Sequence, residues 1–343
     1  MHVAHDPEPV RLQAEIGAGP LEPLLREPGV TDVLVNGAGP VWVDRGSGVE
    51  RSDVVIPDEA GLRRLAQRLV TACGRRLDDA VPHADARLPD GTRLHAILPP
   101  LSPQGTCLSL RLPPRRTFTL GDLVAAGSLP PAGAALLKAL VTARLAFVVT
   151  GGTGTGKTTV LSTMLSLVPP SERLVLVEDA AELRPTHPHV VRLEARLPNA
   201  EGAGGVDLAV LVRQALRMRP DRLVVGEVRG EEVRELLAAL NTGHEGGCGT
   251  LHANRAEHVP ARFEALGAAA GLSRSAVHSQ LGAALDAVVH LRRDSTGQRR
   301  IDGISILVGD LGGLLRAVPA VSFGRDALSP GPGQPELARR LAA

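Results

Sequence analysis

The order of apolar and polar residues divides the chain into two regions with different patterns. From residue 145 onward, short apolar runs rich in valine alternate with segments whose apolar positions recur every three or four residues. Such alternation predicts strands followed by helices, and therefore a mostly parallel sheet covered by helices. We expect strands at 145–150, 174–178, 189–193, 222–226, 248–252 and 286–292, and helices at 157–167, 207–218, 231–241, 256–268 and 273–285.

The region before residue 113 is patterned differently. Residues 33–43 indicate two short strands joined at an Asn-Gly turn, and 59–73 carries apolar residues at helical spacing (62, 65, 66, 69 and 70). Strand and turn signals follow at 86–98 and 107–112. We therefore expect a small α+β domain over 1–112, a linker over 113–130, an α/β domain over 131–327 with a helical approach at 120–140, and a flexible Pro- and Gly-rich tail over 328–343.

Composition narrows the possible settings. A chain of 343 residues is too long for one ordinary core, which agrees with two domains. Three cysteines without a C-x-x-C pair favour a reduced, cytosolic compartment, and the first residues show no signal-peptide pattern. The most apolar window, 134–149, is interrupted by Lys138 and Arg144 and is too short to span a bilayer. We expect any membrane contact to be peripheral.

Residues 151–158 form a complete phosphate-loop motif, G-x-x-x-x-G-K-[ST], directly after an apolar run and before a helical segment. In that context glycines bring backbone N–H groups close to a polyphosphate, so a plain glycine-rich turn is the weaker interpretation. Lys157, one of two lysines in the chain, would reach the β- and γ-phosphates, and the Thr158 hydroxyl would bind Mg²⁺. The nucleotide-binding candidates are Gly151, Gly152, Thr153, Gly154, Thr155, Gly156, Lys157, Thr158 and Thr159.

Three further segments accompany the loop: residues 175–184 with an Glu178-Asp179 pair, residues 216–230 ending in Gly226-Glu227, and residues 242–253 with two histidines. In their order along the chain and in their residues, the four segments resemble the Walker A, Asp box, Walker B and His box of the type II/type IV secretion ATPase superfamily. The likeness is greatest to tight-adherence (Flp) pilus and conjugal-transfer ATPases. Residues 28–37, 85–93 and 108–112 resemble N-terminal signatures of the same family, so the resemblance runs from about residue 20 to about residue 310.

The resemblance implies a RecA-like P-loop domain and a role for each acidic box. Glu178 would orient or deprotonate the attacking water, with Asp179 and Glu182 in support, and Glu227 would hold Mg²⁺, possibly through water. Phosphoryl transfer needs mainly positioning and charge neutralisation, for which carboxylates, Mg²⁺ and cations suffice. We also expect these carboxylates at the carboxyl ends of strands, where ligands bind in parallel sheets.

Histidines and arginines complete the candidate list. His244 and His252 are candidates for sensing the γ-phosphate; the other histidines, His187 and His189 included, are expected at the surface or in turns. The resemblance points to the N-terminal domain as the donor of an arginine to a neighbouring subunit, with Arg93 and Arg111 at matching positions. Arg87 is a weaker third candidate, and Arg229 would couple nucleotide state to the interface.

These features predict a Mg²⁺-dependent ATPase that turns ATP into ADP and phosphate, with a homo-hexameric ring implied by the resemblance. It would power Flp-type pilus assembly or a related secretion machine at the cytoplasmic face of the membrane, through an inner-membrane platform protein. Two alternatives stay open: a motor that moves nucleic acid, and a scaffold that binds nucleotide without turnover. A net charge of +1 and an aromatic content of 1% disfavour a nucleic-acid partner.

Overall fold

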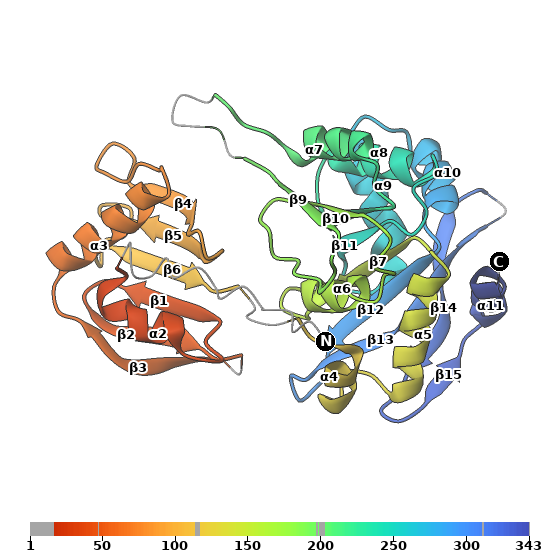
Figure 1. Cartoon of the computed structure of the whole chain (residues 1–343), viewed down its shortest axis with the longest axis horizontal. Coiled ribbons are helices and arrows are strands. Elements are labelled where there is room, and N and C mark those ends of the chain that lie inside the picture. Colours follow the sequence, from red (N-terminus) through yellow and green to blue (C-terminus); the bar gives the residue numbers. More distant parts are fainter. Residues whose placement is uncertain are drawn as a thin grey trace. The chain divides into compact units, whose positions relative to one another are not determined.

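The computed structural model describes residues 17–46, 48–113, 117–196, 198, 203–310 and 312–342 (Figure 1). The chain divides into two compact units, with the boundary between residues 115 and 116. Each unit has its own sheet and its own apolar core. The boundary falls inside the segment that was expected to be a linker.

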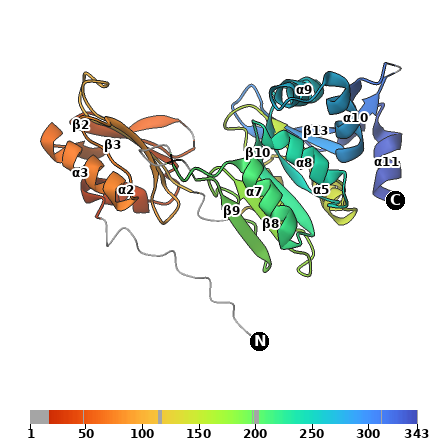
Figure 2. The same cartoon turned by 90° about the horizontal axis from the view of Figure 1, so that it is seen from above.

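The N-terminal unit is a six-stranded antiparallel sheet in the order β3-β2-β1-β6-β5-β4. Alternate residues such as Val33, Val35, Leu94 and Leu108 point to one face and are buried against the helices that cover it (Figure 2). The elements are η1 (Gly19–Leu21), α2 (Glu22–Arg26), β1 (Asp32–Asn36), β2 (Gly39–Asp44), β3 (Val49–Ile56), α3 (Glu59–Ala72), β4 (His83–Arg87), β5 (Arg93–Ile97) and β6 (Cys107–Arg111).

Helix α3 confirms the periodicity expected from the sequence. It begins after Asp58, whose side chain accepts a hydrogen bond from the backbone N–H of Gly61 at 2.6 Å. This bond satisfies one of the N–H groups that a helix start leaves without a partner. The five apolar positions at 62, 65, 66, 69 and 70 are all buried.

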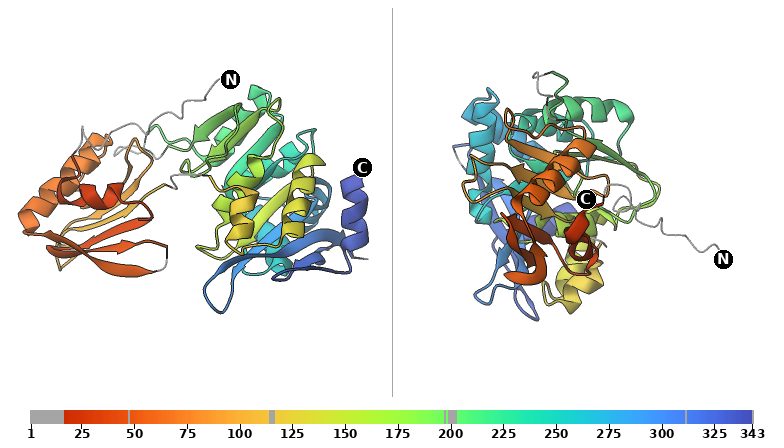
Figure 3. Two further views of the ribbon diagram at one scale, coloured as in Figure 1. Left: turned by 60° about the horizontal axis from the view of Figure 1, so that its bottom comes forward. Right: turned by 90° about the vertical axis from the view of Figure 1, so that its left-hand side faces the viewer.

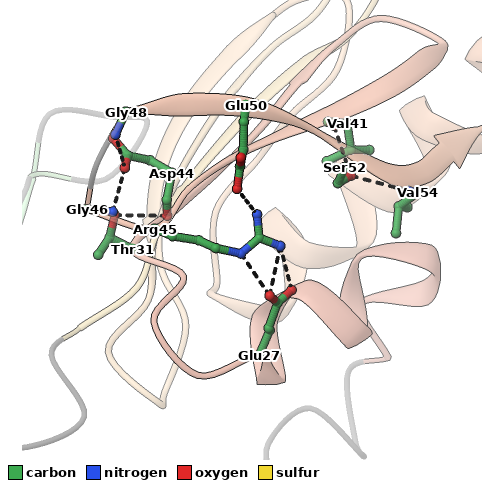
Figure 4. A network of polar contacts seen from close by, with 10 residues as sticks. All are labelled: Glu27, Thr31, Val41, Asp44, Arg45, Gly46, Gly48, Glu50, Ser52 and Val54. Carbon is green, nitrogen blue, oxygen red and sulfur yellow. Dashed lines mark hydrogen bonds and ion pairs between the residues drawn. The ribbon is translucent and has the colours of Figure 1, made fainter.

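Edge strand β3 was not predicted, because its sequence carries Glu50, Arg51 and Asp53 and has little apolar alternation. Side-chain contacts hold it in place (Figure 4). The Arg45 guanidinium bonds to Glu27, with Nε to Oε1 at 2.8 Å, and also to Glu50 at the start of β3. Ser52 Oγ donates to the carbonyl of Val41 on β2 at 2.9 Å. Charged residues on an edge strand also discourage pairing with another chain.

The second unit is a nine-stranded sheet in the order β15-β14-β13-β12-β7-β11-β10-β8-β9. Strands β12, β7, β11, β10, β8 and β9 are parallel, and β13, β14 and β15 extend the sheet in antiparallel fashion. The strands are β7 (Phe147–Gly151), β8 (Leu174–Glu178), β9 (Val190–Glu194), β10 (Arg222–Val228), β11 (Cys248–His252), β12 (Ala287–Arg293), β13 (Arg299–Gly309), β14 (Leu315–Phe323) and β15 (Leu328–Pro330).

Helices cover both faces of this sheet (Figure 3). Apolar residues of α4, α5, α6 and α11 pack on one face, and those of α7, α8, α9 and α10 pack on the other. Valines buried on both sides explain why the central strands read as continuous apolar runs. The helices are α4 (Leu120–Ala125), α5 (Pro131–Thr142), α6 (Lys157–Leu165), α7 (Leu208–Ala215), α8 (Glu232–Leu240), α9 (Val259–Ala269), α10 (Arg274–Ala284) and α11 (Gln334–Ala342), with 3₁₀ turns η2 (Leu216–Met218) and η3 (Ala256–His258).

The strands and helices expected between residues 145 and 292 are all present, and the structure differs on either side of them. The middle of the expected linker forms α4, where Leu123 is buried in the core, and α4 and α5 occupy the helical approach expected at 120–140. The expected flexible tail contains β15 and α11, with Leu337 2% exposed. Packing against β14 stabilises helix α11, although the Pro-rich sequence before it is typical of a flexible tail. Within the described residues, no helix has both the length and the hydropathy needed to cross a membrane.

We expect Arg222→Leu to lower the free energy of unfolding by about 2 kcal/mol, because it removes the buried hydrogen bonds that a charged donor makes, although Arg144 still pairs with Glu172. Arg222 is 1% exposed at the start of β10, and its Nε donates to Glu172 Oε2 at 2.7 Å. Its Nη2 donates to the carbonyl of Val141 at 2.9 Å. Urea unfolding of the full chain measures the loss.

Arg213→Leu is the matched control, since the Arg213–Glu235 pair has a half-exposed arginine and an N–O distance of 2.8 Å. Exposed pairs contribute about 1 kcal/mol or less. Equal losses in the two variants would contradict a special role for the buried pair.

Candidate nucleotide site

The glycine-rich loop, residues 151–156, connects buried strand β7 to helix α6. Gly151, Gly154 and Gly156 have φ values of 154°, 71° and 97°, which residues other than glycine rarely adopt. A Cβ on Gly151 would also lie 2.6 Å from the carbonyl oxygen of Leu291 on β12. The loop therefore requires glycine for its backbone path, and the path ends at the N-terminus of α6, where N–H groups favour anions.

Lys157 lies folded back over this loop. Its Nζ donates to the carbonyls of Gly151 and Gly152 at 3.1 and 3.0 Å. Burial lowers the pKa of the ammonium, while the negative charges of Glu227 and Glu182 act in the opposite direction. The charges of two predicted carboxylates, Glu227 and Glu182, therefore act on the pKa of Lys157.

Glu178 is buried at the end of β8, with 2% of its surface exposed. Burial raises the pKa of its carboxyl to about 7. Oε1 accepts the backbone N–H groups of Glu182 and Leu183, both at 2.9 Å, and Oε2 has no hydrogen-bond partner within the described part of the chain. A Cβ on Gly226 of β10 would lie 2.7 Å from Glu178 Cγ, so the neighbouring strand accommodates this side chain only because residue 226 is glycine.

The other acidic residues differ in their partners. Glu227 is half-buried and follows Gly226 in β10. Asp179 forms an ion pair with Arg229 at 2.7 Å, which joins the segments after β8 and near the end of β10. Glu232 was not among the sequence candidates; its Oε1 accepts the backbone N–H groups of Arg229 and Gly230 at 2.7 and 2.9 Å. Glu232 therefore shapes the turn that carries Arg229.

The two candidate histidines lie at opposite ends of strand β11. His252 is the last residue of β11 and is in register with Gly151, so it lies beside the glycine-rich loop. His244 precedes β11, and its Nδ1 is 3.2 Å from the carbonyl of Ala239 near the end of α8. A segment that precedes a parallel strand lies at the amino edge of the sheet. His244 therefore lies away from the glycine-rich loop of its own chain, and its role in sensing a phosphate stays a prediction.

Two histidines that were expected at the surface are buried instead. His290 on β12 is 7% exposed, and its Nδ1 is 2.9 Å from the Thr150 hydroxyl, directly before the loop. Burial lowers the pKa of this imidazole. His278 is 4% exposed, and its Nδ1 accepts the backbone N–H of Leu315. The apolar run around His290 predicts a buried strand, so it also predicts that the histidine within this strand is buried.

In the N-terminal unit, the three candidate arginines form one row across neighbouring strands. Arg111 of β6 is paired with Arg93 of β5, which is paired with Arg87 of β4. Asp32 of β1 continues the row and accepts a hydrogen bond from Arg111 Nε at 3.0 Å. The row alternates with the buried residues of the same strands and so lies on the face opposite to α3.

The raised pKa of Glu178 predicts a pH-dependent penalty on folding. The carboxyl ionises near pH 4.5 when exposed and near pH 7 in the fold, so its stabilising effect is present below the lower value and is lost as the pH rises to the higher one. We expect Glu178→Gln, which keeps the acceptor oxygen, to gain up to about 3 kcal/mol over the wild type between about pH 5 and pH 8. Urea unfolding of both proteins at each pH measures the difference.

Asp310 supplies a control carboxylate, because backbone N–H groups lower its pKa and its contribution changes at more acidic pH. Asp310→Asn should show no gain across that interval. A difference between wild type and Glu178→Gln that is the same at all pH values would show that the fold does not raise the pKa of this carboxyl.

Comparison with known families places this geometry in context. The family model described as "Type II/IV secretion system protein" matches residues 14–306. A "putative conjugal transfer protein" of Mycobacterium tuberculosis is 59% identical over 303 residues, which cover 86% of each chain. The conjugal transfer protein TrbB of Rhizobium radiobacter is 32% identical over 275 residues, which cover 79% of this chain and 81% of the relative.

A solved structure supports the fold. The X-ray structure of the Legionella pneumophila ATPase DotB has a TM-score of 0.55 and 19% sequence identity, with coverage of 92% of this chain and 82% of that chain. At this identity the likeness concerns the α/β fold alone. The family model covers most of the sequence, and the four boxes lie within the matched range. The chain therefore belongs to the type II/IV secretion system protein family.

Proposed function

We propose that this protein is a Mg²⁺-dependent ATPase with a RecA-like P-loop domain. The observation that carries the proposal is the loop from β7 to α6, in which three glycines have positive φ and the lysine donates to two loop carbonyls. His252 is the last residue of β11 and Glu178 the last residue of β8, two strands of the same parallel sheet that are separated by β10. Ligands of such sheets bind at the carboxyl ends of the strands, where these groups gather.

The residues fit a nucleotide with its metal ion. Lys157 would exchange its two loop carbonyls for phosphate oxygens, while residues 151–159 surround the phosphates. Thr158 would hold Mg²⁺ directly, and Glu227 would do so through water. Among the described residues, no group of three or more His, Cys, Asp or Glu side chains is placed to bind a metal by itself, which agrees with an ion held largely by phosphate and water. When bound, Mg²⁺ neutralises the charge that develops on the phosphates.

Glu178 is the proposed base for the attacking water. A base acts best when its pKa is near the working pH, and burial brings this carboxyl to about 7. Oε2 is the oxygen that could accept the proton, because Oε1 already accepts two backbone N–H groups. Asp179 and Glu182 support the turn, Arg229 links it to β10, and His252 lies where it could respond to the γ-phosphate.

Arg93 and Arg111 are the proposed cations that a neighbouring subunit supplies in a homo-hexameric ring. Their cross-strand pairing concentrates positive charge on an exposed sheet face, which suits a phosphate group. An arginine supplied in trans neutralises transition-state charge and makes turnover depend on assembly. The row also includes Arg87, whose role would be weaker.

The proposed process is work on an inner-membrane platform protein during Flp-type pilus assembly or type II/IV secretion, at the cytoplasmic face of the membrane. Family membership and the relatives named as conjugal transfer proteins support an envelope machine. The division into two compact units supports a mechanical step in which nucleotide state changes the angle between them. Distances between spin labels on the two units in apo, ADP and ATP-analogue states test that step, and identical distances would reject it.

We expect purified protein to hydrolyse Mg²⁺-ATP with a specific activity that rises with protein concentration. Lys157→Ala should abolish turnover, and Arg93→Ala should abolish turnover while it retains ADP binding. Mixing the two inactive variants should restore part of the activity, because one subunit supplies an intact loop and its neighbour an intact arginine. Steady-state phosphate release from the mixtures measures this recovery.

Arg64→Ala is the matched control, since Arg64 is exposed on α3, on the other side of the same sheet from the arginine row. It should keep wild-type turnover. Mixtures without recovered activity would reject an arginine supplied in trans. Wild-type turnover no greater than that of Lys157→Ala, together with tight ATP binding, would favour the nucleotide-binding scaffold.

A nucleic-acid motor is the second candidate, because two relatives carry names that refer to conjugal transfer. This candidate predicts that single-stranded DNA stimulates ATP turnover and that added salt removes the stimulation. Turnover of the wild type without DNA provides the basal reference. Turnover that is insensitive to DNA at low salt would reject the motor and favour a protein substrate.

A further inference from the structure

Two arginines outside the predicted boxes bond to the glycine-rich loop. Arg293 Nη2 and Arg299 Nε each donate to the carbonyl oxygen of Gly154 at 3.0 Å. The two residues are directly paired across strands β12 and β13, so both side chains leave the same end of one hairpin. One carbonyl of the loop therefore accepts bonds from two guanidinium groups.

The hairpin is held firmly at this end. Asp294 accepts hydrogen bonds from the Thr296 hydroxyl and from the backbone N–H groups of Thr296 and Gln298. Gln298 Nε2 donates to the carbonyl of Ala126 at 2.7 Å, which fixes the turn beside α4 (Figure 1). The hairpin thus presents its arginines from a frame that is independent of the loop.

The geometry of the peptide group gives these bonds a consequence for the loop. The C=O of Gly154 and the N–H of Thr155 belong to one planar trans peptide and point in opposite directions. Gly154 has a φ of 71° and lacks a Cβ, so its backbone alone restricts the rotation of this peptide weakly. Bonds from Arg293 and Arg299 select the orientation in which the carbonyl points to the hairpin and the N–H points away from it.

We infer that Arg293 and Arg299 are positioning residues that preset the Thr155 N–H for a nucleoside polyphosphate. The inference rests on the proposed nucleotide site, because the backbone N–H groups of such a loop are the donors that bind phosphate. A preset donor lowers the cost of ordering the loop on binding. The guanidinium charges also polarise the peptide, which makes its N–H a stronger donor.

The test measures ADP dissociation constants without Mg²⁺ for Arg293→Ala, Arg299→Ala and the double variant in the full chain. We expect each single variant to weaken ADP binding by about threefold and the double variant by about tenfold or more, as for lost bonds to charged groups. Arg292→Ala is the matched control, since Arg292 is an exposed neighbour on β12 that pairs with Asp302. It removes the same charge and should bind ADP within about twofold of the wild type.

A second readout separates positioning from a general loss of structure. The double lysine variant keeps two cationic donors and should recover most of the affinity, while the amide resonance of Thr155 should shift in the double alanine variant before any ligand is added. Wild-type affinity in the double alanine variant, or an equal loss in Arg292→Ala, would overturn the inference. If the double alanine variant does not fold, the two single variants decide by the same comparison.

The proposed function and this inference fail in different ways. A wild-type protein that binds ADP no better than Lys157→Ala would reject the nucleotide site itself. Binding that is lost in Lys157→Ala and unchanged in the double alanine variant would reject only the role of the two arginines.

Discussion

The burial of strand β7 between β11 and β12 is the constraint on which the candidate nucleotide site depends. Parallel pairing on both sides fixes where β7 ends, so the chain must turn at Gly151 with almost no space around it. The turn leads directly into α6. The same pairing places His252 and Leu291 beside the first glycine. The position of the loop is therefore a property of the central sheet, and the glycines allow the chain to follow it.

A buried carboxylate and a missing side chain form a second such arrangement. Glu178 occupies space that only a glycine at position 226 leaves open, and its burial raises the pKa. The two acidic boxes are thus linked sterically as well as chemically, since the residue before Glu227 determines where Glu178 can lie. Such a group destabilises the fold when ionised, a cost that proteins accept mainly at sites with a function.

The antiparallel extension of the sheet also serves the site. Strands β13 and β14 enlarge the core, and the hairpin between β12 and β13 reaches the glycine-rich loop through Arg293 and Arg299. Arginines have long side chains with several donors, so two strands can address one carbonyl from different directions. The C-terminal part of the chain thereby becomes part of the site, although it lies far from the loop in sequence.

Local residue order determined the strands and helices from 145 to 292, the five buried positions of α3, and the loop with Lys157, because periodicity and glycine spacing act over a few residues. Only the tertiary structure decided that α11 is a helix, that His244 lies at the edge away from the loop, and that His290 and Arg293 lie against it. These outcomes depend on strand order and register, which bring residues about 140 positions apart into contact. The spacing of residues along the chain does not predict which distant segments come into contact.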